Sequence, residues 1–319
     1  MTIEELKNQI DHVLKDKKSS SQLYLVLKRE DQYSLCRVDW NDKKTEPEIK
    51  QLFINAVEQK ILSNDELELR ELSRADNRGN VLYHYDYDTY PEIAWFSDFS
   101  IDAAVQDAEV FDGKTASCEG LFGYVIYIGT MNHGVVLFKK HYPVTLLRHG
   151  KNCLLFNSRR MEPIDADILR ISGDFQLFKV GTEMYIRDLN IMEKWLDFDK
   201  ILKKDAENAL QNIANKNLID SMEDLEKGLN DKSFMKNLAR AYRSSPIFSQ
   251  NISAERIMEF IEKSPTLKND IRFNEDHTRI CLRTKTARKQ FLKILNDDYL
   301  HSLLTGIDYD TKAKDPIKP

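Results

Sequence analysis

The spacing of apolar positions predicts one helix before and one helix after a β-hairpin near the N-terminus. Residues 2–16 repeat apolar side chains at helical intervals behind Thr2, and Pro47 opens a second helical stretch over 48–61. Between these stretches, residues 23–28 and 33–38 have the composition of two strands joined by a short turn. The first part of the chain is therefore expected to contain strands flanked by two helices.

Strand patterns dominate the middle of the chain. Residues 121–129 are β-branched and aromatic, and a turn signal at 132–134 leads into a second strand over 134–139. Shorter strands follow after further turn signals, over 151–156, 168–171, 175–180 and 184–187.

Helical periodicity takes over from about residue 190. Apolar side chains recur at helical spacing from Phe198 to Leu218. We therefore predict an α+β protein with a β-rich N-terminal half with flanking helices and a helical C-terminal half. A length of 319 residues suits two domains, a mixed α/β domain rich in antiparallel strands over 1–189 and a mainly helical domain over 190–319. Further helices are expected near 221–229, 232–243, 253–263 and 285–295, interrupted by a small hairpin at 270–273 and 279–282.

Composition narrows the class of protein. Apolar residues make up 41% and charged residues 31%, which is typical of a soluble globular chain. The longest apolar run, over 121–131, is much shorter than the roughly 20 residues that span a bilayer. The acidic N-terminus does not resemble a signal peptide, so we expect a cytoplasmic protein. The four cysteines lack the spacing of a metal or redox motif, and we expect neither a metal nor a cofactor.

The charge distribution is uneven although the chain has a formal net charge of −5. Acids make up 52 of the 319 residues, so 42 residues should hold about seven, yet none occurs from Gly120 to Met161. A polyanion such as DNA is the natural partner for such a stretch. The alternative is that these bases pair with the acidic segment 86–112 inside the fold. The candidate phosphate contacts are Lys139, Lys140, Arg148, Lys151, Arg159 and Arg160.

Two further groups of bases lie in the predicted helices. Lys236, Arg240 and Arg243 occupy positions i, i+4 and i+7, which places them on one helix face, and we include them as candidate nucleic-acid contacts. A third run begins at Arg283, and its members cover the face opposite the apolar positions. For Lys236, Arg240 and Arg243 a solvated basic face is the more frequent explanation, and the bases of the third run near the end of their helix also suit the helix dipole. The third run consists of Arg283, Lys285, Arg288, Lys289 and Lys293.

Two motifs resemble a known family. Residues 295–306 read LNDDYLHSLLTG, with Tyr309 and Lys312 behind them, and 175–187 contain Phe175–Phe178 and Met184–Arg187. These stretches resemble the KwaB family of the Kiwa anti-phage system. We expect the closing motif to end the last helix and to fix the tail.

The resemblance implies a function that the residues alone do not indicate. It implies a cytosolic DNA-binding protein that works with a small membrane protein, KwaA, at the inner face of the membrane. There the assembly would interfere with replication or transcription of phage DNA. The resemblance supplies no catalytic residues, so we expect a non-enzymatic protein, and we expect a homodimer because most soluble oligomers are symmetric.

Two alternatives remain open at this stage. In the first alternative, the protein is a non-enzymatic interaction subunit. Its charged segments dock a membrane partner and take no part in DNA binding. A metal-dependent nuclease is the second alternative, because Asp86 and Asp88 alternate on a possible strand and would share one face. No lysine partner of a nuclease site follows them, which makes this alternative the weaker one.

Overall fold

The computed structural model describes residues 1–30, 32–40, 43–76, 78–88, 96, 108–111, 120–130, 133–142, 146–147, 154–157, 160–163, 168–311 and 314. The chain forms two compact units. Unit 1 comprises residues 1–70, 80–85 and 92–191, and unit 2 comprises 71–79, 86–91 and 192–319. Hydrophobic periodicity gives no sign that the two short segments near residue 80 belong with the helical unit.

Unit 1 is built on a large sheet with two long helices. The helices are α1 (Ile3–Lys15) and α2 (Thr45–Val57), and α2 continues as one π-helical turn, η1 (Glu58–Leu62). The strands that form the sheet are β1 (Ser20–Arg29), β2 (Gln32–Arg37), β3 (Glu68–Glu71), β4 (Val81–His84), β5 (Glu109–Val110), β6 (Leu121–Gly129), β7 (Gly134–Lys140), β12 (Leu177–Val180) and β13 (Glu183–Ile186).

Within the described residues, the strand order of this sheet is β3-β4-β13-β12-β7-β6-β1-β2-β5. The central pairs are antiparallel, and the edge pair β2–β5 is parallel. The order places β6 and β7, which carry the acid-free stretch, at the centre of the sheet. Two small pairs lie outside it, β8 (Leu146–Leu147) with β11 (Ile168–Leu169) and β9 (Leu154–Asn157) with β10 (Arg160–Pro163).

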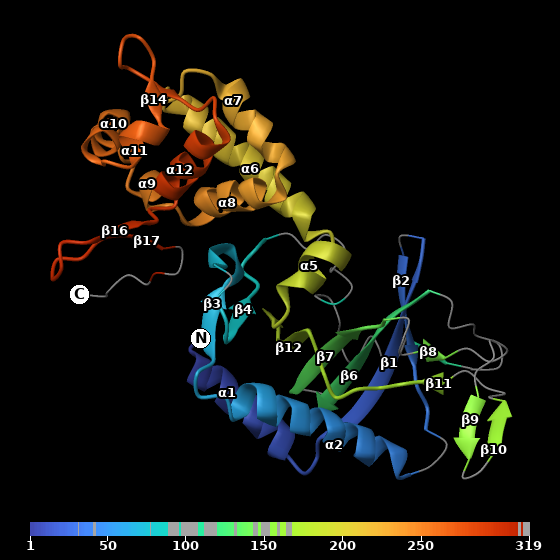
Figure 1. The fold of residues 1–319 in the computed structure, drawn as a ribbon. Coiled ribbons are helices and arrows are strands. Elements are labelled where there is room, and N and C mark those ends of the chain that lie inside the picture. The colour runs from blue at the N-terminus through green and yellow to red at the C-terminus, as the bar shows by residue number, and fades with distance from the viewer. Residues whose placement is uncertain are drawn as a thin grey trace. The chain divides into compact units, whose positions relative to one another are not determined.

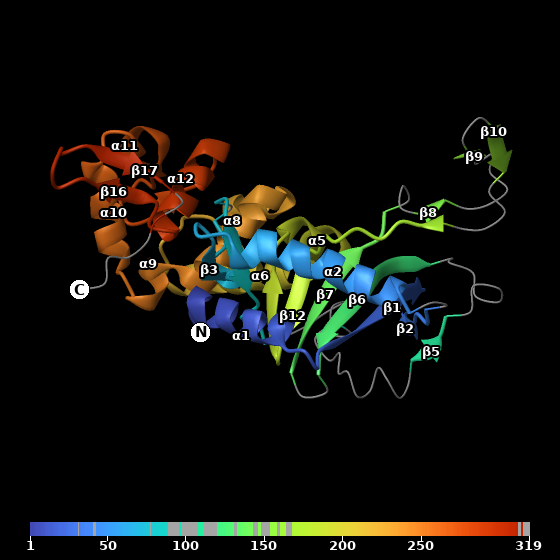
Figure 2. The same ribbon diagram turned by 90° about the horizontal axis from the view of Figure 1, so that it is seen from below.

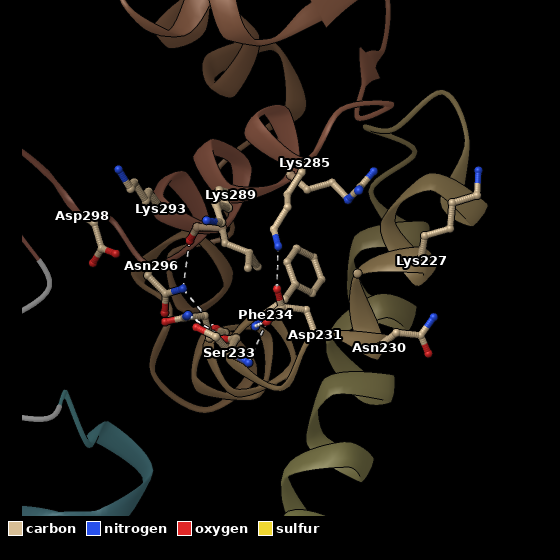
Figure 3. A pocket seen from close by; sticks show the side chains of 14 residues that line it. Lys227, Asn230, Asp231, Ser233, Phe234, Lys285, Lys289, Lys293, Asn296 and Asp298 are labelled. Carbon is tan, nitrogen blue, oxygen red and sulfur yellow. Dashed lines mark hydrogen bonds and ion pairs between the residues drawn. The ribbon is translucent and has the colours of Figure 1, made fainter.

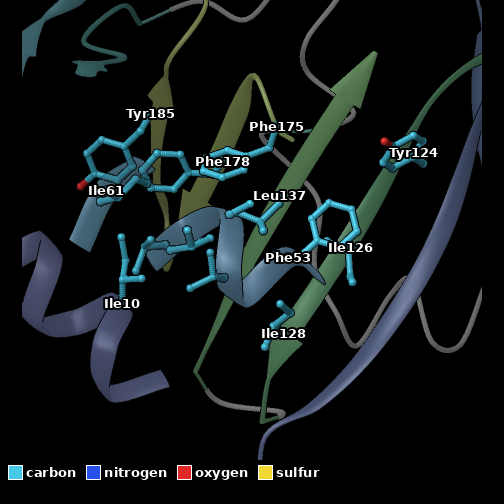
Figure 4. Packing of buried hydrophobic residues seen from close by; sticks show 14 of the residues in the cluster. Ile10, Phe53, Ile61, Tyr124, Ile126, Ile128, Leu137, Phe175, Phe178 and Tyr185 are labelled. Atoms are coloured by element: carbon cyan, nitrogen blue, oxygen red, sulfur yellow. The ribbon is translucent and has the colours of Figure 1, made fainter. Parts of the chain in front are cut away.

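The core of unit 1 lies between the sheet and its two helices. Figures 1 and 2 show α1 and α2 side by side across one face of the strands β12, β7, β6 and β1. Alternate strand residues point to this face, and Ile126 of β6 pairs with Leu137 of β7 below Phe53 of α2 (Figure 4). Thr2 begins α1 with a capping box to Glu5, as the N-terminal sequence indicates.

Unit 2 is mainly helical. Its longest helices are α6 (Phe198–Asn215) and α8 (Lys232–Ser244), which pack against each other. The other elements are η2 (Leu72–Arg74), α7 (Met222–Glu226), η4 (Lys227–Asn230), α9 (Pro246–Ser249), α10 (Ala254–Lys263), α11 (Leu267–Asp270), α12 (Lys285–Leu295) and the hairpins β14 (Arg272–Phe273) with β15 (Ile280–Cys281) and β16 (Tyr299–His301) with β17 (Asp308–Asp310). Helix α5 (Leu189–Trp195) spans the change from unit 1 to unit 2.

The observed fold confirms the α+β class, with the sheet in the N-terminal part and helices in the C-terminal part. Strands β6 and β7 and helix α12 occupy almost the predicted residues. The hairpin β16–β17 was not predicted, because its apolar residues follow no strand alternation. Among the described residues, no helix combines the length and apolar character needed to cross a membrane.

Candidate nucleic-acid interface

Lys139 does not face solvent as a phosphate contact. It lies on β7, and its Nζ is 2.5 Å from a carboxylate oxygen of Asp174, which Lys60 and Arg187 also contact. Burial opposes ionisation of this carboxyl, but hydrogen bonds and attraction from Lys139 and Lys60 outweigh burial and hold the pKa of Asp174 well below its ordinary value. The structure thus corrects the expectation for Lys139, whose charge is compensated inside unit 1.

Lys140 is buried, with 7% of its surface exposed. Its Nζ lies 4.4 Å from the centre of the Phe122 ring and donates to the carbonyl oxygen of His141 at 3.1 Å. Burial, followed by the nearby charge of Lys28, lowers the pKa of Lys140 to about 8. The Lys140 ammonium group lies over the Phe122 ring and is buried, so the structure corrects the expectation that it is free to contact phosphate.

The remaining mid-chain candidates have no described side chains. Arg148, Lys151 and Arg159 lie outside the described residues. Arg160 begins β10 and pairs with Asn157 of β9, but only its backbone is described. For these four bases, contact with DNA stays a prediction.

The basic row on α8 is also largely engaged with carboxylates of its own unit. Lys236 Nζ is 2.5 Å from Glu193, and Arg243 binds both oxygens of Asp205, at 2.7 and 2.9 Å. Its hydrogen bond to Asp205 raises the pKa of Arg243. Arg240 lies on the same helix and is partly exposed. The structure therefore corrects the expectation that Lys236 and Arg243 present free charge to DNA.

Four members of the third basic run, by contrast, line a pocket of unit 2. The pocket has a volume of about 570 Å³ and lies between α12 on one side and η4 with the start of α8 on the other (Figure 3). Five cations line it against two acids. The residues that line the pocket are Lys227, Gly228, Asn230, Asp231, Ser233, Phe234, Asn237, Lys285, Arg288, Lys289, Leu292, Lys293, Asn296 and Asp298.

Helix α12 supplies most of the positive charge. Thr284 caps its N-terminus by accepting from the backbone N–H of Ala287 at 3.0 Å. Lys285, Lys289 and Lys293 follow at intervals of four residues, which places them in one row along the helix. Phe291 and Leu295 are buried on the other side, so packing of the apolar face determines where the lysines point.

The opposite wall is held close by a glycine. A side chain at Gly228 would meet the ring of Phe234 at 2.5 Å, so only glycine lets η4 approach α8 this closely. Asp231 caps α8 by accepting from the backbone N–H groups of Ser233 and Phe234, at 3.0 and 3.3 Å. Asn296, at the end of α12, donates to the carbonyl oxygen of Asn237 at 3.1 Å and connects the two walls.

The charges in the pocket are only partly compensated. Lys285 Nζ lies 3.1 Å from Asp231, and this hydrogen bond, with those from the backbone, lowers the pKa of the Asp231 carboxyl (Figure 3). Lys293 pairs with Asp310, and Asp298 pairs with Lys314. Lys289 is exposed, and no carboxylate of the described residues pairs with it. The pocket therefore presents a positive surface that an external anion would neutralise.

Sequence reasoning missed the η4 wall of this pocket. Lys227 and Gly228 lie at the end of the helix expected near 221–229, but nothing in the sequence placed that end beside the third basic run. One signal was present: Asp231 directly before the helix over 232–243 is an N-cap residue, and Gly228 three residues earlier indicates close backbone packing.

Comparisons with known proteins place the chain in a family. The model of the Kiwa protein KwaB-like family matches residues 119–305, more than half of the chain. The chain belongs to the KwaB family. It is similar to the Kiwa protein KwaB of Escherichia coli O55:H7 (strain RM12579 / EPEC), with 26% identity over 323 residues that cover 99% of each chain. No solved structure gives a significant match.

Membership in the KwaB family confirms the resemblance of the closing motif and makes the chain a component of the Kiwa anti-phage defence system. The KwaB-like match includes both walls of the cationic pocket and ends at residue 305, at the tip of the β16–β17 hairpin. The pocket is thus part of the region by which the family is recognised.

The carboxylates proposed for a nuclease do not form a metal site with other described residues. Asp86 accepts hydrogen bonds from the backbone N–H of Ser73, at 3.0 Å, and from its hydroxyl group, at 2.5 Å. Across the described part of the chain, no group of three or more His, Cys, Asp or Glu side chains is arranged to hold a metal ion. Asp86 therefore has a structural partner that accounts for its position.

Proposed function

We propose that this KwaB-family protein binds DNA without sequence preference through the cationic pocket between α12 and the η4–α8 junction. The observation that carries the proposal is the gathering of five cations from separate segments around one pocket, in a chain whose net charge is negative. In a protein of negative net charge, a positively charged surface forms only where the fold brings basic side chains together. Phosphate groups are the ligand that such a surface attracts.

The arrangement suits contacts to the DNA backbone. Lys285, Lys289 and Lys293 form a row rather than a point, and a row of cations can follow successive phosphates of one strand. Such contacts position the duplex but carry no sequence information. Binding would release condensed counterions, so the affinity is expected to fall steeply as the salt concentration rises.

A charge-reversal variant tests the site. Lys289→Glu changes an exposed lysine, so the fold should stay intact. We expect it to weaken binding of a fluorescent duplex and to lower the salt slope of log K by about 0.9 for each phosphate contact that is lost. Fluorescence anisotropy across a salt series measures both effects. A triple variant, Lys285→Gln with Lys289→Gln and Lys293→Gln, should lose most of the binding.

The matched control is Lys203→Glu, which makes the same change of charge at an exposed helical lysine outside the pocket lining. It should bind DNA nearly as the parent protein does. If Lys289→Glu and the triple variant bind with parental affinity and slope while thermal melting shows both to be folded, the pocket is not the DNA site.

In the defence system, we propose that the protein acts as a non-enzymatic effector. Bound along phage DNA, it would obstruct replication or transcription, and a KwaA-like membrane protein would hold it at the inner face of the membrane. Family membership supports this assignment. Co-purification with the membrane partner tests the localisation, and incubation of plasmid with the protein and Mg²⁺ or Mn²⁺ tests for a nuclease. If the protein cleaves the plasmid and Asp86→Asn abolishes the cleavage, the protein is a metal-dependent nuclease and the effector proposal is wrong.

A further inference from the structure

The hairpin β16–β17 carries an exposed, uncharged tip. Its two strands are antiparallel, and residues 302–307 form the turn between them. In this turn Leu303 is 97% exposed, Leu304 is 94% exposed and Ile307 is 52% exposed. None of the six residues of the turn carries a charge. Apolar side chains that are held in water gain free energy when another apolar surface covers them.

The tip has a defined shape and its base is attached to α12. The backbone N–H of Ser302 donates to the carbonyl oxygen of Ile307 at 2.9 Å, and that of Gly306 donates to the carbonyl oxygen of Ser302 at 2.8 Å. Gly306 has a φ of +68°, a conformation that glycine adopts at little cost. At the base of the hairpin, the Tyr299 hydroxyl donates to the side-chain oxygen of Gln290 on α12 at 2.6 Å. The hairpin is therefore a short arm with a fixed origin.

This arm continues the cationic pocket. Lys293 is the last lysine of the row on α12, and it both lines the pocket and pairs with Asp310 of β17. Asp298 also lines the pocket, and β16 begins at the next residue (Figure 1). Three paired residues on each strand carry the turn roughly 10 Å beyond this point. The cationic surface and the apolar tip are therefore contiguous parts of unit 2.

The negative charge of the arm is confined to its strands and is matched there. Asp310 pairs with Lys293, and a carboxylate oxygen of Asp308 lies 2.8 Å from Nδ1 of His301. The turn beyond these pairs offers a partner only apolar side chains and backbone. A polyanion that lies along the lysine row would thus meet an uncharged apolar point at the end of the row.

Apolar side chains beside phosphate-binding cations are the means by which architectural proteins bend DNA. The cations hold the backbone, and the apolar side chains enter between two base pairs, unstack them and kink the duplex by about 20–90°. We propose that Leu303 and Leu304 are such a wedge and enter the base stack of the duplex that the lysine row of α12 holds. This inference rests on the proposed DNA binding by the cationic pocket, and it adds that the bound DNA is bent.

The wedge gives the protein a preference for deformable DNA. Unstacking costs less at a mismatch or at a flexible pyrimidine–purine step, so the protein should bind more tightly there although it reads no base edge. A membrane is the less suitable partner for the tip. A single long acyl chain already gives only marginal membrane binding, and two leucines bury less apolar surface than such a chain.

A duplex with a dye at each end tests the bend by resonance energy transfer, and 2-aminopurine in the duplex tests unstacking by its fluorescence. Saturating parent protein should raise both signals. Leu303→Ser with Leu304→Ser should leave both at the level of free DNA, while the salt slope of binding stays unchanged because every lysine remains. The parent protein should also bind a mismatched duplex about tenfold or more tightly than a matched one, and the double variant should lose this preference.

Two controls separate the wedge from general effects of the substitutions. Both leucines already lie in water, so the double variant should melt at the parental temperature. Leu303→Met with Leu304→Met keeps large apolar side chains and should retain the bend. Val110→Ser makes a similar change at an exposed apolar residue of unit 1, 47% exposed, and should bend DNA as the parent protein does.

Parental bending and unstacking by the Leu303→Ser, Leu304→Ser variant would overturn the wedge. So would a parent protein that binds the duplex with the expected salt slope but leaves it straight, and in that case DNA binding by the pocket still stands. A parent protein that does not bind the duplex at all would overturn both proposals. If the double variant bends DNA normally but no longer binds vesicles of phosphatidylethanolamine and phosphatidylglycerol, the tip contacts lipid and the wedge is wrong.

Discussion

At the scale of single residues, neighbouring charges decided which of the predicted bases are available. Lys139 and Lys140 adjoin in the sequence, and both lie on the central strand β7. Lys139 pairs with Asp174, which also pairs with Lys60 and Arg187. Lys140 is buried over the ring of Phe122. Local sequence shows a pair of lysines, but the partners that compensate or bury them come from distant segments.

The burial of Lys140 predicts an unusual dependence of stability on pH. Its pKa is about 8 in the folded protein against an ordinary 10.5, so between these values the unfolded chain binds more protons and the stability rises with pH. Lys140→Met should remove this rise and should be neutral or stabilising at pH 7, because no buried charge remains. Urea unfolding at pH 7, 8.5 and 10 measures the difference between the two proteins. An equal change in both proteins from pH 7 to 10 would contradict the assignment.

At the scale of elements, the pocket depends on how closely η4 approaches α8. The five cations come from η4 and α12, and the apolar face of α12 determines the direction of its lysines. Gly228 permits the short distance between η4 and the Phe234 ring. The geometry of the pocket is therefore expected to be sensitive to a single methyl group.

Gly228→Ala tests this dependence. The added methyl group would lie 2.5 Å from the Phe234 ring, and the strain should lower the free energy of unfolding by about 1–3 kcal/mol. The variant should also weaken duplex binding, because η4 must move away from α8 and Lys227 moves with it. Gly79→Ala is the control, since no atom lies within 4 Å of its added methyl group, and it should cost nothing measurable in urea unfolding. Equal stability of the two variants would show that the close approach is unimportant.

At the scale of the whole molecule, the expected homodimer and the proposed DNA site should reinforce each other. A dimer would carry two cationic pockets, and binding of the second pocket to the same duplex becomes intramolecular.

This coupling predicts a dependence on duplex length. A long duplex that reaches both pockets of a dimer should bind about tenfold or more tightly than a short duplex that reaches only one, since the second contact adds to the first. Anisotropy with the two duplexes at the same salt concentration measures both affinities. Equal affinity for the two duplexes would contradict the coupling.

Several features of the protein follow from sequence alone because they depend on neighbours in the chain. The period of apolar residues determined α12 and the strands β6 and β7 almost to the residue, and Thr2 with Glu5 predicted the start of α1. The closing motif identified the family, because the order of residues carries that information directly. The acid-free stretch correctly marked unusual charge but did not show where that charge would lie.

Tertiary structure alone decided which charges remain available, because compensation depends on groups far apart in the sequence. It joined Lys139 to Asp174 across 35 positions and Arg243 to Asp205 across 38, while it brought Lys227 beside α12. It also left Leu303 and Leu304 in water, which their apolar character alone would not suggest. Burial and pairing are properties of the packed chain, whereas periodicity and motif are properties of its order.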